Sequence, residues 1–407
     1  MKILIVNQPL NNRGDESALK GLVRKLINEI PDVQIKVLWV GSNQNSINQF
    51  AVKSPKVEYL NIKSQKACAR SLIYGVKYGF KFLWHIHPTI KKMMKLYQEA
   101  DYIMCAPGGI CMGGFQNWGH ITQLFIAKYL KKPIIYYGRS LGPFPTETKD
   151  NRKFKAISTE LLNYFSFLSI RDKKTELLAQ QMGVNYVVTV DSAFLDAPKV
   201  TIPSEITKSI DGSSYMVFVP NLLIWHYAYK GRISKETILS FYSKIIDVIK
   251  NKYPELKIVM LPQTFNYGSY TGDDIHLFNE IKQLKHDERI VVIPDCYSSD
   301  IQQTLISNAK FLIGARYHSV VFALNQAIPF IALSYEHKIS GLLETLHKGD
   351  CMIDIAHALD DEENIKNAVE QISSKLDNIK GDIQAKRNAK SIADACFVQL
   401  KDILIKT

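Results

Sequence analysis

The chain has 407 residues and a formal net charge of +12, and this length suggests two domains with a core in each. Hydrophobic residues make up 46% and charged residues 22% of it, as in an ordinary soluble globular protein. No apolar run reaches the roughly eighteen residues of a transmembrane helix, and the apolar start at residues 1–6 is too short for a signal peptide. Six scattered cysteines without a Cys-x-x-Cys pair argue against a zinc site or a disulfide framework and fit a reducing cytosol.

Short apolar runs alternate with amphipathic patterns along the chain, which predicts a βαβ architecture. In the first half, strands are expected at residues 3–6, 34–40, 102–105, 133–137, 168–170 and 186–189, and helices at 15–28, 120–129, 151–164 and 173–181. In the second half, strands are expected at 215–219, 257–261, 290–293, 311–313 and 330–333, and helices at 235–250, 273–285, 299–307, 319–325 and 339–347.

The boundary between the halves is expected at residues 196–212, which are rich in Pro, Ser, Thr and charge. The predicted organisation is an N-terminal Rossmann-like domain at 1–200, a C-terminal Rossmann-like domain at 205–385 and a C-terminal helix at 386–407. The predicted fold class is therefore α/β, with two doubly wound domains facing a cleft. Ligands of such sheets bind at the carboxyl ends of the strands, so binding residues are expected in the turns that follow the strands.

The positive charge is concentrated in residues 59–98, which contain no Asp or Glu. Eight cations lie there, interleaved with aromatic and aliphatic residues: Lys63, Lys66, Arg70, Lys77, Lys81, Lys91, Lys92 and Lys95. Such a segment is typical of an interfacial helix on anionic lipid. Two other interpretations stay open, a helical pair with one buried and one solvated basic face, and a nucleic-acid contact. Since nothing else resembles a nucleic-acid module, no nucleic-acid partner is expected.

Residues 11–16 (NNRGDE) follow the first predicted strand and open the first predicted helix. Gly14 permits a tight turn, and a helix N-terminus there would present free N–H groups to an anion or a sugar hydroxyl. Asp15 is either an N-cap or a carboxylate that receives a hydroxyl proton. The spacing alone does not decide between them.

Residues 106–115 (APGGICMGGF) form a glycine-rich turn after another strand, and Gly108 and Gly109 would let a ligand approach the backbone closely. The pattern is neither the dinucleotide G-x-G-x-x-G nor a P-loop, which makes NAD or ATP unexpected. A flexible connection is the alternative interpretation.

Two arginines follow later strands. Arg139 stands in residues 137–144 (YGRSLGPF), where its guanidinium is expected to reach the cleft, and Arg171 stands in residues 169–172 (SIRD). Arg171 would contact ligand or a domain interface, or be an ordinary solvated arginine, while Asp172 is expected to cap the next helix. Residues 190–194 (VDSAF) and 261–264 (LPQT), with Gln263, are further candidates, or turn chemistry.

The most informative stretch is residues 313–319 (IGARYHS), followed by residues 335–341 (YEHKISG). Arg316 and His318 would project the same way if the backbone were extended, and Lys338 follows the next strand. Two cationic residues at one helix N-terminus oppose the helix dipole, and an anionic ligand would resolve that conflict. Arginine clamps carboxylate or phosphate, histidine moves protons and lysine adds a charge, so this group suits a small, highly anionic substrate.

Taken in order, these motifs from about Asn11 to Gly341 resemble the polysaccharide pyruvyl transferase family. The resemblance implies a two-domain enzyme of the glycosyltransferase-B type whose C-terminal domain binds the donor. Such enzymes transfer the carboxyvinyl group of phosphoenolpyruvate to a sugar of a capsule, exopolysaccharide or other cell-surface glycan, or of its lipid-linked precursor, forming a cyclic ketal and releasing phosphate. The basic segment 59–98 is not matched by the family pattern.

For that reaction, His318 is the expected acid, Asp15 the expected base, and Arg316 and Arg139, with Lys338, the expected binders of carboxylate and phosphate. Gly14, Gly108, Gly109, Arg171 and Gln263 complete the expected binding residues. No metal and no cofactor is expected besides phosphoenolpyruvate as co-substrate. The expected location is the cytoplasm, at the inner face of the membrane if the basic segment docks there.

Two other functions stay open at this stage. One is a nucleotide-sugar-dependent glycosyltransferase of polysaccharide biosynthesis, which would use the same fold, although no clear acidic ribose clamp is visible. The other is a non-catalytic capsule-assembly scaffold that binds a glycan–lipid through residues 63–95. Such a scaffold would not need His318.

Overall fold

The computed structural model describes residues 1–9, 11–40, 51–63, 66–109, 112–113, 116–226, 229, 231–265, 273–294 and 296–406. Contacts divide the chain into two compact units. Unit 1 comprises Met1–Leu10, Asp15–Asp196 and Ser391–Thr407, and unit 2 comprises Asn11–Gly14 and Ala197–Lys390.

Unit 1 is built on a seven-stranded sheet with the order β3-β2-β1-β4-β5-β6-β7, in which every neighbouring pair is parallel. Its strands are β1 Lys2–Val6, β2 Gln34–Val40, β3 Val57–Ile62, β4 Tyr102–Cys105, β5 Ile134–Arg139, β6 Phe167–Ile170 and β7 Val187–Val188. The central strands β4 and β5 are buried at every residue. Their continuous apolar sequences follow from this, since a parallel sheet is covered on both faces.

The helices of unit 1 are α1 Arg13–Glu29, α3 Lys66–Tyr78, α4 Phe82–Ile86, α5 Pro88–Glu99, α6 Trp118–Tyr129, α7 Lys149–Leu162, α8 Lys173–Gln181, the 3-10 turn η1 Ser192–Leu195 and the last part of α16 Ile383–Ile405. One face of the sheet shares a core with α3 to α8, and its strand residues include Leu4, Ile103 and Tyr136. α16 is tied to α1 by ion pairs of Lys25 with Asp394 (3.1 Å) and of Lys401 with Glu29 (2.9 Å). The chain's last helix therefore completes a domain that its first strand begins.

Unit 2 has a six-stranded parallel sheet with the order β10-β9-β8-β11-β12-β13. Its strands are β8 Tyr215–Val219, β9 Lys257–Met260, β10 Ile290–Val292, β11 Leu312–Gly314, β12 Phe330–Ser334 and β13 Met352–Asp354. Its helices are α9 Ser204–Ile210, α10 Lys235–Lys252, α11 Asp274–Lys285, α12 Ser299–Ser307, α13 Tyr317–Gln326, α14 His337–Thr345 and α15 Glu362–Asp377, with 3-10 turns η2 Leu223–Trp225 and η4 Gly349–Cys351. Helices α10, α11 and α15 cover one face of this sheet and build its core with Phe218, Ile313 and Leu333.

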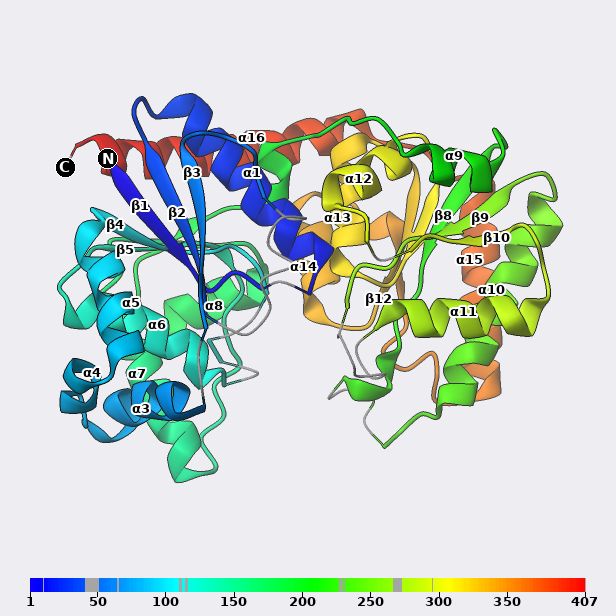
Figure 1. The fold of residues 1–407 in the computed structure, drawn as a ribbon. Coiled ribbons are helices and arrows are strands. Elements are labelled where there is room, and N and C mark those ends of the chain that lie inside the picture. The colour runs from blue at the N-terminus through cyan, green and yellow to red at the C-terminus, as the bar shows by residue number, and fades with distance from the viewer. Residues whose placement is uncertain are drawn as a thin grey trace. The chain divides into compact units, whose positions relative to one another are not determined.

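The predicted fold class is confirmed, because each unit is a parallel, doubly wound α/β sheet (Figure 1). The sequence reading missed the edge strands β3 and β13, the short helix α9 inside the proposed boundary, and the division of 59–98 into a strand and three helices. Edge strands are short and half-exposed, so their apolar signal is weak. In the described part of the chain, no helix is both long and apolar enough to span a membrane.

Candidate functional site

In unit 2, the turns after β8, β9, β11 and β12 carry polar side chains to the carboxyl edge of the sheet. Arg316 follows β11 directly, at the N-cap of α13, and its guanidinium pairs with Asp274 at the start of α11. The Asp274 side chain is 1% exposed. Burial alone would lower the pKa of Arg316, but the Asp274 carboxylate raises it, so the guanidinium stays charged.

This pair corrects one expectation from the sequence. The positive charge at the N-terminus of α13 does not need a ligand to offset it, because Asp274 is present. The pairing uses one terminal nitrogen of Arg316, and its buried Nε has no hydrogen-bond partner among the described residues. The guanidinium therefore retains donors for a second anion.

Asp274 also shapes the turn that contains Gln263. Its Oδ2 accepts hydrogen bonds from the backbone N–H groups of Gln263 and Thr264, both at 2.9 Å. Gln263 is 2% exposed, and its side-chain nitrogen Nε2 has no hydrogen-bond partner within the described part of the chain. The backbone carbonyl of Gln263 accepts a hydrogen bond from the N–H of Arg13 at 2.9 Å. The side-chain nitrogen is available for a ligand, so the ligand contact expected for Gln263 stays a prediction.

Glu336 and Lys338 form a second charged group after β12. The Glu336 carboxylate lies 3.1 Å from Lys338 Nζ and 3.3 Å from His226 Nε2. Burial alone would raise the pKa of Glu336, but Lys338 and His226 together lower it to about 2. Lys338 is accordingly held in place by a carboxylate, as Arg316 is.

Glu336 makes the acid stability of the protein testable. Its pKa lies below the ordinary value of 4.5, so it contributes stability that is complete above pH 4.5 and is lost as the pH falls toward about 2. We expect Glu336→Gln to remove about 3 kcal/mol of this pH-dependent stability, since one pKa unit corresponds to about 1.4 kcal/mol. Urea unfolding on both sides of this range measures it, with exposed Glu370→Gln as control. An equally steep acid loss in Glu336→Gln would contradict the assignment.

Tyr335 follows β12 and directly precedes Glu336. Its ring is 5.1 Å from that of His226, and its hydroxyl accepts a hydrogen bond from Asn221 Nδ2 at 2.8 Å. Burial raises its pKa, with a further contribution from the Glu336 charge, so the phenol stays protonated. A neutral, buried phenol thus lies next to Glu336 in the chain, within the field of both Glu336 and Arg316.

His318 lies on the first turn of α13 and is packed against Gly14. A Cβ added to Gly14 would lie 1.8 Å from Nδ1 of His318, so only glycine fits there. Because α13 begins at Tyr317, the expectation of an extended backbone that aligns Arg316 with His318 is wrong. Arg316 is extended and His318 is helical, and His318 is 6% exposed.

In unit 1, Asp15 lies on the first turn of α1 beside the glycine turn after β4. A Cβ on Gly108, whose φ is +148°, would lie 2.6 Å from Oδ1 of Asp15. Asp15 is not the N-cap: the side chain of Asn12 accepts from the N–H of Gly14 at 2.8 Å, before the Asp15 position. The N-cap interpretation of Asp15 is therefore wrong, and its role as a proton-accepting carboxylate stays a prediction.

Arg139 is fully buried, which corrects the expectation that it reaches a ligand. Its guanidinium donates to the carbonyl oxygens of Ala106 and of Gly109, the latter at 3.0 Å. Arg139 holds the glycine turn in shape. Nothing lies within 4 Å of a Cβ added to Gly109, so that position is open, while Ile110, Cys111, Gly114 and Phe115 of the motif lie outside the described residues.

Arg171 is also buried and pairs with Asp191, which is 0% exposed. Asp191 in turn accepts from the N–H of Ala193 at 2.9 Å and caps η1. This arrangement corrects the expectation of a ligand contact for Arg171. The cap predicted at Asp172 is confirmed, since its side chain accepts from the N–H of Thr175 at 2.9 Å.

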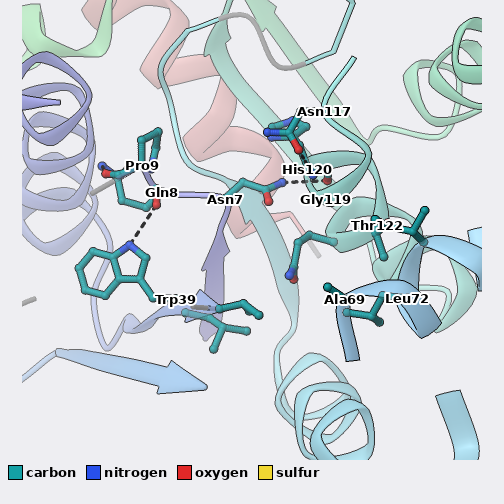
Figure 2. Close-up of a pocket in the computed structure, with 14 residues that line it drawn as sticks. Asn7, Gln8, Pro9, Trp39, Ala69, Leu72, Asn117, Gly119, His120 and Thr122 are labelled. Carbon is teal, nitrogen blue, oxygen red and sulfur yellow. Dashed lines mark hydrogen bonds between the residues drawn. The ribbon is translucent and has the colours of Figure 1, made fainter. Parts of the chain in front are cut away.

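Unit 1 also contains a cavity of about 380 Å³ at the carboxyl ends of β1 and β2 (Figure 2). Its lining includes polar residues (Asn7, Gln8, Asn117, His120 and Gln123) and apolar or aromatic residues (Leu38, Trp39, Ala69, Leu72 and Ile73). The indole N–H of Trp39 donates to the Gln8 carbonyl at 3.0 Å, and Asn7 Nδ2 donates to the His120 carbonyl at 3.1 Å. Burial and the nearby Arg139 lower the pKa of His120, which stays neutral.

The sequence reading missed Asp274, Glu336, His226 and this cavity. Asn117 precedes a helix as a side-chain cap and could have been found from that signal. Glu336 lies in the motif 335–341, in which only Lys338 was predicted to be a site residue. Among the residues that the structure describes, no group of three or more His, Cys, Asp or Glu side chains is placed to hold a metal ion.

Residues 12–337 match the sequence pattern of the polysaccharide pyruvyl transferase family, which covers most of the chain and ends one residue before Lys338. The chain belongs to this family. A relative of this pyruvyl transferase is the amylovoran biosynthesis protein AmsJ of Erwinia amylovora, which is 22% identical over 404 residues, 93% of this chain and 92% of AmsJ. The family identifies the protein as an enzyme of polysaccharide pyruvyl transfer.

Solved structures with the same fold include UDP-GlcNAc 2-epimerases. That of Neisseria meningitidis has a TM-score of 0.59 at 13% identity, with full coverage of both chains. That of Methanocaldococcus jannaschii has a TM-score of 0.58 at 15% identity, covering 98% of this pyruvyl transferase and 100% of that chain. At such identities the likeness concerns the fold alone, and it confirms the glycosyltransferase-B type of two Rossmann-like domains.

Proposed function

We propose that this pyruvyl transferase uses phosphoenolpyruvate as donor and forms a cyclic pyruvate ketal on a sugar of an exopolysaccharide or other cell-surface polysaccharide, or of its lipid-linked precursor. The observation that carries the proposal is the group at the carboxyl edge of the unit 2 sheet. There Arg316 and Lys338 are each oriented by a buried carboxylate, and His318 follows Arg316 by two residues. Family membership and the relation to an amylovoran biosynthesis protein support the same reaction class.

Arg316 is the proposed binder of the donor carboxylate. Asp274 fixes one side of its guanidinium, and the remaining N–H groups can meet a carboxylate in the two-point geometry that arginine favours. Lys338, held at 3.1 Å by Glu336, is the proposed contact of the donor phosphate. Binding of a dianion between two pre-oriented cations requires little side-chain ordering.

His318 is the proposed general acid. It protonates the methylene carbon of phosphoenolpyruvate, which leaves an oxocarbenium-like centre at the carbon that bears the phosphate ester. A sugar hydroxyl adds to that centre and loses its proton to a base. The C–O bond to phosphate then breaks, phosphate departs with its electron pair, and a second hydroxyl adds and loses its proton to close the ketal ring.

The acceptor sugar is proposed to bind in the unit 1 cavity. A pocket lined by both amide side chains and apolar side chains suits a sugar ring, which has hydroxyl edges and an apolar face. Asp15, beside Gly108 in the same unit, is the proposed base for the attacking hydroxyl. This scheme requires no metal and no cofactor.

Arg316→Lys tests the donor assignment. We expect the KM for phosphoenolpyruvate to rise about ten- to a hundredfold, because a charge-assisted contact is worth about 1.5–3 kcal/mol and an ammonium cannot replace the planar fork. Initial rates of phosphate release over a range of donor concentrations measure the change. Arg232→Lys, at an exposed ion pair, is the control. An unchanged KM would remove Arg316 from the donor site.

The function itself is tested by phosphate release from phosphoenolpyruvate in the presence of hexosides and lipid-linked glycans, with mass spectrometry of the acceptor. A pyruvate ketal on one acceptor, dependent on His318, is the expected result. Release of a nucleotide from a nucleotide sugar, with no ketal from phosphoenolpyruvate, would establish a glycosyltransferase instead.

A further inference from the structure

Helix α3 and the short helix α4 lie at one end of unit 1 (Figure 1). These helices and the link between them expose a row of aromatic and aliphatic side chains. We call this row the aromatic ridge, and it consists of Tyr74, Tyr78, Phe80, Phe82 and Ile86. They are 45–66% exposed, and consecutive rings from Tyr74 to Phe82 have centroids 5.5–6.3 Å apart. Exposed apolar surface of this continuity marks an interaction site.

The ridge is presented by a rigid support. Trp84 of α4 is fully buried, and its indole N–H donates to the Ser71 carbonyl of α3 at 3.1 Å. A Cβ on Gly75 would lie 2.2 Å from that indole, so the two helices pack as closely as a glycine allows. The buried face of α3 is formed by Cys68, Leu72 and Val76. The exposed rings are therefore a fixed surface of the folded protein.

Basic side chains continue the ridge and border it. Lys66 and Arg70 precede Tyr74 and Tyr78 at intervals of four residues on α3, so all four lie along one exposed helix face. Lys153 Nζ lies 4.9 Å from the centroid of the Tyr78 ring. Lys77 forms an ion pair with the neighbouring Asp150 and so compensates its negative charge. The surface thus combines exposed rings with a net positive border.

We propose that this surface docks unit 1 onto an anionic lipid bilayer. Aromatic rings insert at the boundary between headgroups and acyl chains, while lysine and arginine attract anionic headgroups. A protein partner fits less well, because protein interfaces are depleted in lysine whereas this segment carries eight cations and no acid over residues 59–98.

The docking surface borders the cavity of unit 1. Ala69, Leu72 and Ile73 of α3 line that cavity, and the next residue, Tyr74, belongs to the ridge (Figure 2). A bilayer in contact with α3 therefore lies beside the wall of the cavity. Resting on the proposed function, this places a lipid-linked acceptor with its lipid in the membrane and its glycan within reach of the cavity.

Vesicle sedimentation of the full chain tests the docking. We expect binding to vesicles of phosphatidylcholine mixed with phosphatidylglycerol, weaker binding to phosphatidylcholine alone, and loss of binding as salt rises. The triple variant Phe80→Ser, Phe82→Ser, Ile86→Ser is expected to bind about tenfold or more weakly, and so is Lys66→Glu with Arg70→Glu. The matched control is Leu284→Ser with Ile383→Ser, which removes equally exposed apolar side chains elsewhere.

Wild-type protein that stays in the supernatant, or a folded triple variant that sediments like wild type, would overturn the proposal, as would self-association through the ridge in place of vesicle binding. The test of membrane docking can be distinguished from the test of the proposed pyruvate transfer. Transfer of pyruvate to a water-soluble sugar should survive in the triple variant, while transfer to a lipid-linked acceptor in anionic vesicles should fall. If vesicles bind but no ketal forms, the proposed function fails and the docking surface stands.

Discussion

Replacement of His318 by Ala is expected to lower kcat for ketal formation by a factor of about 10²–10⁴, the usual contribution of a positioned general acid. The side chain is 6% exposed on the first turn of α13, next to Arg316, and the residues around it are held by other contacts. The fold and the binding of phosphoenolpyruvate should therefore persist. Phosphate release measures the rate, and thermal unfolding with and without phosphoenolpyruvate measures folding and binding.

Gly14→Ala is expected to impair the same step without removing any catalytic group. Its new Cβ would lie 1.8 Å from the imidazole, so the ring of His318 must move. The matched control is Gly349→Ala, where a Cβ meets nothing within 4 Å. Full turnover in a folded His318→Ala variant would exclude His318 as the acid. Full activity of Gly14→Ala would show that the position of the imidazole does not matter.

The carboxyl-edge location of the candidate residues could be predicted from sequence. Apolar runs define the strands. The turns after them carry Gly108 and Arg316, and the first turns of the following helices carry Asp15 and Lys338. This works because the periodicity of a strand and the residue types of a turn are local properties. The packing of Gly14 on His318 is not local, and no feature near either residue indicates it.

The roles of individual charges were harder to predict, because they depend on partners distant in sequence. Arg139 ends strand β5 and Arg316 lies just after β11. The buried guanidinium of Arg139 donates to backbone carbonyls, whereas that of Arg316 pairs with a carboxylate and retains other donors. Asp274 appeared in the sequence only as the first turn of a helix. Its burial beside Arg316 depends on the order of β8, β9 and β11 in the sheet, which the chain order alone does not give.

Partners distant in sequence also determine what Arg139 and Arg171 stabilise, and these two residues differ from Arg316 in this respect. Arg139 stabilises the glycine turn, and Arg171 stabilises the turn after β6 together with η1. Both act at the carboxyl edge of the unit 1 sheet without offering their charge to solvent. Because both arginines hold backbone turns in place, we expect their replacement to lower the stability of the protein.

Arg171→Ala is accordingly expected to destabilise the protein by about 3–5 kcal/mol, the cost of leaving one partner of a buried ion pair without the other. The Asp191 carboxylate, 0% exposed, would remain as an uncompensated buried charge. Urea unfolding measures the loss, and the double variant Arg171→Met with Asp191→Leu should recover part of it because both charges are gone. The control Arg232→Ala, at an exposed pair with Asp360, should cost about 1 kcal/mol or less. A similarly small loss for Arg171→Ala would show that water reaches Asp191 and that the turn after β6 does not depend on this pair.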